Sequence, residues 1–239
     1  MQRIVDALSA KLPEGSVRLQ TRAAVLSKTD ADGTWILTTD QGEELEADGI
    51  ILALPAYGAA ETLSTMAPGL AKELQSIPYT STATVSLAYR RSDIPKALDA
   101  FGFVVPARER RKIIACTFSS VKYPGRAPEG YDLLRAFVGG ALQPSLFEQD
   151  DQAMELCVRE ELSALLGIQA PPVLCRVHRH PRSMPQYHIG HLDRVGRINE
   201  HLTRLTGLRL AGNAYEGVGI ADCVRSGEDA AEALLASVG

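Results

Sequence analysis

The residues whose types and spacing most clearly suggest a chemical role lie in the stretch LRLAGNAYEGVGIADC, residues 208–223. A short apolar run leads to Gly217 and Gly219, and a segment with helical periodicity follows directly. Glycines let a backbone approach a ligand closely, and the free N–H groups and dipole of a helix N-terminus favour electron-rich groups. The pattern predicts either a ligand-binding turn or a tight turn that only joins a strand to a helix.

The glycine spacing matches only part of the dinucleotide fingerprint G-x-G-x-x-G. Gly217 and Gly219 fill the first two positions, but Asp222 occupies the third. The sequence ends at residue 239, so the second strand and the ribose-binding acid of such a unit do not follow. We therefore do not predict a complete mononucleotide-binding unit here.

A window rich in histidine raises the question of a metal site. It contains His178, His180, His188, His191 and His201. His178 and His180 would share a strand face, and the spacing of His188 and His191 suits one helical turn. However, Pro185 and Gly190 interrupt helical continuity, and no cysteine or carboxylate stands at ligand spacing. We predict surface or loop histidines and no metal.

Composition narrows the class of protein. The chain has 239 residues, 45% of them hydrophobic, which is enough apolar surface for a core. Its net charge of -4, with interspersed signs, argues against a nucleic-acid partner, and we interpret the one basic run, RERRK at 108–112, as a solvated loop. Four scattered cysteines without a C-x-x-C pair predict buried thiols in a reducing compartment. Without a long apolar run or a signal peptide, we expect a cytoplasmic protein with at most peripheral membrane contact.

Two kinds of secondary-structure pattern alternate along the chain. SVRLQ (16–20) and AAVLSKT (23–29) predict strands, and GIILAL (49–54), apolar on both faces, predicts a strand buried from both sides and followed by a helix. From Thr82 the strict alternation of polar and apolar residues predicts half-buried antiparallel strands. A helix is expected at about 148–166, and a strand and helix end the chain.

These patterns predict a mixed fold, partly α/β and partly α+β. We expect an incomplete Rossmann-like lobe built from both chain ends, residues 1–76 and 206–239. Residues 77–205 should form a central antiparallel β-sheet lobe with helices.

Several segments together resemble the flavin-dependent protoporphyrinogen and coproporphyrinogen oxidases of the flavin amine oxidase superfamily. The C-terminal signature of that family is matched by Gly212, Gly217, Val218, Gly219, Asp222, Cys223, Ser226 and Gly227. MPQYHIGH (184–191), ADGIILALPAYGAAETL (47–63) and MQRIVDALSAKL (1–12) are similar to further family segments. The resemblance runs over the whole chain, but it corresponds only to the second half of a family member.

The resemblance implies an FAD cofactor and residues that contact it. The backbone at Val218, Gly219 and Ile220, with Gly217 before them, would approach the flavin ring. The backbone of Ala23 would lie by the adenine. His180 stands where the family often has tryptophan, so that a histidine would change the stacking and polarity near the flavin.

The partial match also carries an expectation about the cofactor. Family members hold the FAD pyrophosphate with a Gly-rich loop that this sequence does not contain. We therefore expect FAD binding by this chain alone to be weak or absent, and a missing N-terminal Rossmann half to act as its partner.

The reaction that the resemblance implies belongs to haem biosynthesis. It is the oxidation of protoporphyrinogen IX or coproporphyrinogen III to the porphyrin, with hydride passing to the flavin and dioxygen reoxidising it. We assign no catalytic acid or base. Substrate carboxylates could meet one of five strand arginines, each of which could equally be solvated: Arg90, Arg91, Arg135, Arg176 and Arg179. The alternatives are a non-catalytic binding or partner module of the same fold, or another flavin amine oxidase.

Overall fold

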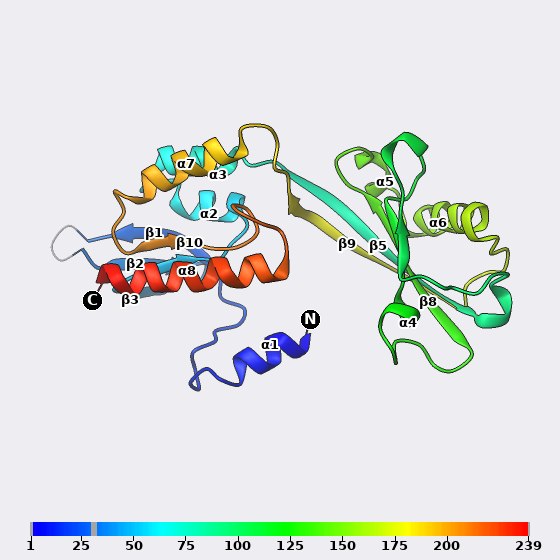
Figure 1. Cartoon of the computed structure of the whole chain (residues 1–239). Coiled ribbons are helices and arrows are strands. Elements are labelled where there is room, and N and C mark those ends of the chain that lie inside the picture. The colour runs from blue at the N-terminus through cyan, green and yellow to red at the C-terminus, as the bar shows by residue number, and fades with distance from the viewer. Residues whose placement is uncertain (1, 30–32, 239) are drawn as a thin grey trace. The chain divides into compact units, whose positions relative to one another are not determined.

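The protein divides into two compact units. A computed structural model describes residues 2–29 and 33–238 (Figure 1). The first unit is formed by Met1–Ile77 with Tyr187–Gly239, and the second by Pro78–Gln186. The first unit is therefore discontinuous in sequence, with the second inserted into it.

The first unit combines two small sheets with helices. An antiparallel sheet contains β1 (Ala23–Lys28), β2 (Trp35–Thr39) and β3 (Glu44–Ala47), and a parallel pair contains β4 (Ile50–Leu52) and β10 (Leu208–Leu210). The helices are α1 (Gln2–Ser9), α2 (Ala56–Leu63), α3 (Pro68–Gln75), α7 (His191–Leu202) and α8 (Ile220–Val238).

The parallel pair joins the two ends of the sequence. Ile50 lies opposite Leu208 and Leu52 opposite Leu210. The Ile50 amide donates to the Gly207 carbonyl at 2.7 Å, and the Ala211 amide donates to the Leu52 carbonyl at 3.1 Å. Helix α8 contacts both strands (Figure 1). The apolar GIILAL run forms a strand followed by a helix, as predicted, but the predicted burial from both sides is wrong, because Ile51 is 37% exposed.

Helix α1 is amphipathic in sequence, but none of its residues is buried. Ile4, Val5 and Leu8 recur at helical spacing, yet each is about half exposed or more. Leu12 and Leu19, in the segment that follows, are also exposed. Burial of such an apolar stripe is what normally stabilises a short helix, and α1 lacks it within the described residues.

The second unit is an antiparallel sheet that packs on a helix. Its strand order is β6 (Gly102–Val104), β7 (Ala115–Phe118), β8 (Tyr131–Gly139), β5 (Tyr79–Arg90) and β9 (Leu174–Pro185). Its helices are α4 (Ser119–Lys122), α5 (Pro144–Phe147) and α6 (Asp151–Leu166), with 3₁₀ turns at Arg91–Asp93 and Ala107–Glu109.

Alternation along β5 separates the two faces of this sheet. Ala83, Val85 and Leu87 are fully buried in a core that also holds Val158 and Leu162 of α6. Helix α6 begins where the Asp150 carboxylate accepts a hydrogen bond from the Ala153 amide at 2.8 Å, a side-chain N-cap. The opposite side of the sheet, here called the outer face, carries polar side chains.

The two ends of the second unit lie together. Tyr79 of β5 pairs with Pro185 of β9, and the Gln186 amide donates to the Pro78 carbonyl at 2.9 Å. The chain therefore enters and leaves this unit along the same antiparallel pair of strands.

The structure corrects several sequence predictions. Besides the exposed Ile51 of β4, His191 is buried at 4% exposure and is not a surface or loop histidine. The mixed α/β architecture with antiparallel sheets is confirmed. Residues 16–20 form no strand, because the chain turns there and Gln20 has a φ of 56°. Residues 187–205 lie in the first unit, where α7 contacts α3 and Arg197 bonds Glu73 at 3.0 Å, rather than with the central strands. Cys175 and Cys223 are only partly buried, whereas Cys116 and Cys157 are buried as expected.

Over residues 2–29 and 33–238, none of the helices combines the length and the apolar character needed to cross a bilayer.

Gly207 tests the packing at the start of β10. Its φ is +83°, and an added Cβ would lie 2.6 Å from Nε1 of the fully buried Trp35. We predict that Gly207→Ala lowers the free energy of unfolding by about 2–4 kcal/mol, from backbone strain and overpacking together. Trp35 is the only tryptophan, so its fluorescence can follow unfolding of the first unit.

Gly42 provides the matched control for this substitution. Its φ is +80°, but an added Cβ would meet nothing within 4 Å. Gly42→Ala should therefore cost only about 1 kcal/mol, which is the backbone contribution. Equal losses for the two variants would show that contact with Trp35 is not the constraint.

Candidate functional site

The turn that precedes α8 presents exposed backbone at a helix N-terminus. Helix α8 begins at Ile220, and its first hydrogen bond runs from the Cys223 amide to the Gly219 carbonyl at 2.9 Å. The side chains of Val218 and Ile220 are each 55% exposed. The first amides of a helix have no acceptor within it, and the positive end of its dipole lies there. The turn can therefore hold an electron-rich group.

The glycines of this turn are required by a close neighbour. Neither has a φ in the left-handed region. A Cβ added at Gly217 would lie 2.6 Å from Cβ of Asp222, and one added at Gly219 would lie 2.7 Å from Oδ2 of Asp222. Asp222, the residue that departs from the dinucleotide fingerprint, thus fills the space beside both glycines.

The loop leading into the turn is anchored by polar contacts from α8 and from the segment at Tyr187 and His191, all within the first unit. The Gly212 amide, at a φ of +118°, donates to Oγ of Ser226 in α8 at 3.1 Å. Tyr187 donates its hydroxyl to the Asn213 carbonyl at 2.7 Å. His191, whose ring stacks on Tyr187 at 4.0 Å, places Nε2 2.8 Å from the Tyr215 carbonyl. MPQYHIGH and the C-terminal signature therefore meet in space.

Ala23 lies in another part of the first unit, at the start of β1. It pairs with Thr39, but Val25 pairs with Thr38, so Ala24 is an extra residue in a bulge. Such a bulge leaves strand backbone outside the regular ladder.

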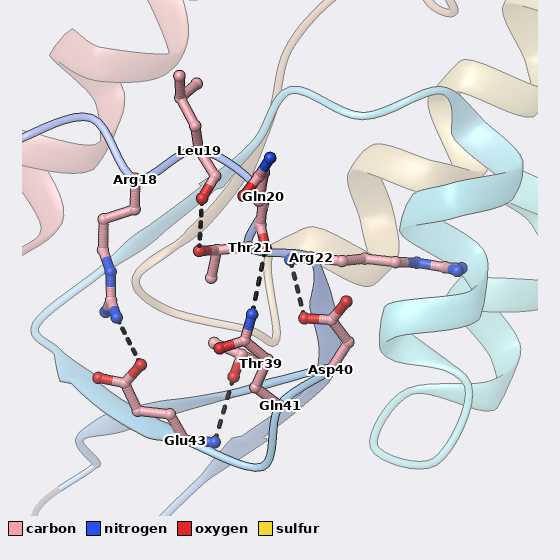
Figure 2. Close-up of polar contacts among 9 residues, drawn as sticks. All are labelled: Arg18, Leu19, Gln20, Thr21, Arg22, Thr39, Asp40, Gln41 and Glu43. Carbon is pink, nitrogen blue, oxygen red and sulfur yellow. Dashed lines mark hydrogen bonds and ion pairs between the residues drawn. The ribbon is translucent and has the colours of Figure 1, made fainter.

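The chain before β1 is fixed to the turn between β2 and β3, as Figure 2 shows. The Arg22 amide donates to Oδ1 of Asp40 at 3.1 Å, and the Asp40 amide donates to the Arg22 carbonyl at 2.9 Å. Gln41 donates its side-chain amide to the Gln20 carbonyl at 3.3 Å, and Arg18 forms an ion pair with Glu43. These contacts hold the entry to Ala23 in place.

The structure gathers only some of the predicted site residues. Gly217, Val218, Gly219 and Ile220 form one turn, and Ala23 lies on a separate sheet of the same unit. His180 belongs to the second unit, where it is exposed on the outer face with Nε2 3.4 Å from Oγ1 of Thr84.

Neither the histidines nor the cysteines form a reactive cluster. In the part of the chain that the structure describes, no three His, Cys, Asp or Glu side chains are placed to share a metal ion. Burial raises the pKa of the Cys116 thiol to about 12, which leaves the thiolate nucleophile unpopulated near neutral pH.

The outer face of the second unit carries two arginines on either side of a serine. Ser86 of β5 lies opposite Arg135 of β8 on one side and opposite Arg176 of β9 on the other. Two other candidate arginines have structural partners: Arg91 bonds Asp132, and Arg179 bonds Asp151. Alternation in YDLLRAFVG indicated that Arg135 points away from the core, although its neighbours were not predictable.

The fold defines the general class. At 15% identity, a putrescine oxidase variant matches 99% of this chain with a TM-score of 0.70. A reduced UDP-galactopyranose mutase matches 87% of it with a TM-score of 0.69 at 18% identity. The chain thus shares its fold with these enzymes.

The sequence places the chain in a family. It belongs to the flavin containing amine oxidoreductases, whose model matches residues 1–235. It is 33% identical over 98% of its length to coproporphyrinogen III oxidase of Bacillus subtilis (strain 168), and 34% identical over 98% to protoporphyrinogen oxidase of Bos taurus. It covers 49% and 50% of those proteins.

A crystal structure from Exiguobacterium sp. 255-15, solved as a candidate protoporphyrinogen oxidase, matches 98% of this chain with a TM-score of 0.83 at 31% identity. The match covers half of that protein's own chain. The chain spans about half the length of the curated relatives it matches.

The contact with Asp222 predicts different costs at the two glycines. Gly217→Ala should lower the free energy of unfolding by about 1–3 kcal/mol, because the new Cβ meets the root of the Asp222 side chain. Gly219→Ala should cost less than about 1 kcal/mol, because only the carboxylate end must rotate. Chemical denaturation of the single variants measures both.

A double variant tests the cause. Replacing Asp222 by glycine removes the obstructing atoms, so Gly217→Ala combined with Asp222→Gly should lose less stability than the sum of the single changes. Strict additivity would show that Asp222 is not what excludes a side chain at position 217.

Proposed function

We propose that this chain is the C-terminal portion of an FAD-dependent porphyrinogen oxidase of haem biosynthesis. The observation that carries the proposal is the exposed turn at residues 217–220, at the N-terminus of α8, within a chain whose curated relatives are coproporphyrinogen and protoporphyrinogen oxidases. The substrate would be a porphyrinogen, and dioxygen would be the final electron acceptor.

The residues of the first unit fit the flavin of this family. When bound, the flavin would supply the acceptor for the hydride that leaves the porphyrinogen. The amides that begin α8 and the positive end of its dipole would favour electron density at the edge of the ring. Gly219 would allow close approach, and the bulged backbone beside Ala23 would be available to the adenine.

The two units would then divide the work. The first unit would form part of the FAD-binding lobe, completed by a Rossmann half that corresponds to the part of the relatives this chain does not match. The second unit, whose outer face exposes His180, would contribute to substrate binding. Taken by itself, the chain would bind FAD weakly and would not turn over.

A second candidate is a non-catalytic partner module that completes a separate chain carrying the Rossmann half. The exposed apolar stripe of α1 favours this candidate, because such a stripe is suited to packing on another polypeptide. Another flavin amine oxidase would be distinguished by its turnover of amines.

Gly219→Val tests the assignment of the turn to the flavin. The chain is joined behind the first half of the Bacillus subtilis relative, and thermal unfolding is measured with and without FAD. We expect the FAD-dependent rise in melting temperature to disappear in Gly219→Val while the apo protein remains folded. An added Cβ at Gly219 would lie 2.7 Å from Oδ2 of Asp222, so the valine would push this carboxylate aside and change the turn that the ring approaches.

Gly196→Val, on an exposed part of α7 where an added Cβ meets nothing within 4 Å, is the matched control and should keep the full shift. A full FAD-dependent shift in Gly219→Val would contradict the assignment.

Porphyrinogen oxidation tests the activity itself. The joined protein should convert coproporphyrinogen III or protoporphyrinogen IX to the fluorescent porphyrin in air, with release of peroxide, and the unjoined chain should not. If the joined protein binds FAD stoichiometrically but oxidises neither porphyrinogen, the partner-module candidate is the better explanation.

A further inference from the structure

A basic cavity of about 240 Å³ lies on the second unit, between strands β7 and β8 of the sheet and α4. Its lining consists of Thr117, Ser119, Lys122, Tyr123, Arg126, Leu133, Arg135 and Phe137. Three of these residues are basic and none is acidic. This is a concentration of positive charge in a chain whose net charge is -4.

Strand pairing and one buried carboxylate fix the cavity. Thr117 of β7 lies opposite Arg135 of β8, so both side chains emerge on the outer face. Ser120 donates its hydroxyl to Asp132 at 2.9 Å and accepts the Leu133 amide at 3.2 Å, which holds α4 against β8. The walls are therefore built into the fold.

The other two basic residues of the cavity, Lys122 and Arg126, both contact the ring of Tyr123. Nζ of Lys122 is 5.5 Å and Cζ of Arg126 is 5.8 Å from the ring centroid of Tyr123. Cation–π contacts orient such groups without neutralising them.

The cations of the cavity keep their charge available. Among the described residues, no ion pair involves Lys122, Arg126 or Arg135. The carboxylate of Asp132 is buried and committed to Arg91 and Ser120. Arg135 places Nε 3.4 Å from Oγ of Ser86, a neutral partner.

A second guanidinium continues this row across the sheet. Arg176 lies on the other side of Ser86 from Arg135, on the same face. Thr117, Arg135, Ser86 and Arg176 thus form one line across four strands. A ligand with several carboxylates can contact this line and the cavity at once.

We propose that the cavity, together with Arg176, binds the carboxyethyl arms of the substrate and makes the enzyme prefer a porphyrinogen with such an arm on every pyrrole ring. The preferred substrate is then coproporphyrinogen, which carries four arms, over protoporphyrinogen, which carries two. The inference rests on the proposed function and deepens it. A cavity of this size is below the range for drug-sized ligands, so it takes an arm and not the macrocycle. Arginine matches the planar carboxylate in geometry as well as in charge.

The test uses the full chain and air-stable porphyrins as probes. Binding of coproporphyrin III, its tetramethyl ester and protoporphyrin IX is measured by porphyrin fluorescence at low and high salt. We expect coproporphyrin III to bind on the order of tenfold more tightly than the other two, and the difference to shrink with salt. Arg126→Gln and Arg135→Gln should each weaken coproporphyrin binding by about tenfold, as expected for the loss of a charge-assisted contact.

Arg110→Gln is the control variant, because Arg110 belongs to the same unit but lines a different cavity. It should leave all three affinities unchanged, and circular dichroism verifies that each variant is folded. The proposal is overturned if the ester binds as tightly as the acid, if the wild-type chain binds no coproporphyrin, or if Arg126→Gln and Arg135→Gln bind like the wild type.

This proposal and the proposed function can fail separately. FAD binding and porphyrinogen oxidation decide the function. The carboxylate preference of the probes decides the role of the cavity. A joined protein that oxidises porphyrinogens without any preference would keep the function and remove the inference.

Discussion

The parallel pairing of β4 with β10 is the constraint on which the rest of the structure depends. Strands that are distant in sequence must meet here, so the chain between them leaves the first unit after Ile77 and returns to it at Tyr187. The pairing also sets where α8 begins, because the segment 211–219 runs directly from β10 to that helix. The turn at 217–220 is therefore positioned by hydrogen bonds between the two halves of a divided unit.

Much of the architecture could be predicted because the local spacing of apolar and polar residues indicates helices and strands. GIILAL forms a strand as its apolar run predicted, although one side of it stays exposed at Ile51, and the alternation from Thr82 corresponds to a half-buried strand. The position of α7 could not be predicted in this way. Its buried residues, Val195 and Ile198, show that the helix packs but not on which partner. Helix α7 packs on α3, and because this contact is long-range in sequence, no local pattern predicts it.

The candidate site likewise has features that the local sequence shows and features that appear only in the fold. The glycine spacing of the turn was visible in sequence, and so was the mismatch at Asp222. That the Asp222 side chain itself fills the space beside both glycines was not, because it depends on the first turn of α8 folding back. The basic cavity was missed for a similar reason. Lys122 and Arg126 belong to a short helix and its loop, and they meet Arg135 only because β7 and β8 pair.

The meeting of the two ends of the second unit has a consequence for how such a protein can be rebuilt. Pro78 and Gln186 are hydrogen-bonded neighbours, so a short peptide bridge could replace the whole segment between them without stretching the host. Conversely, a different sheet with adjacent ends could be grafted at the same junction. The second unit is in this sense a segment that can be exchanged while the first unit keeps its sequence.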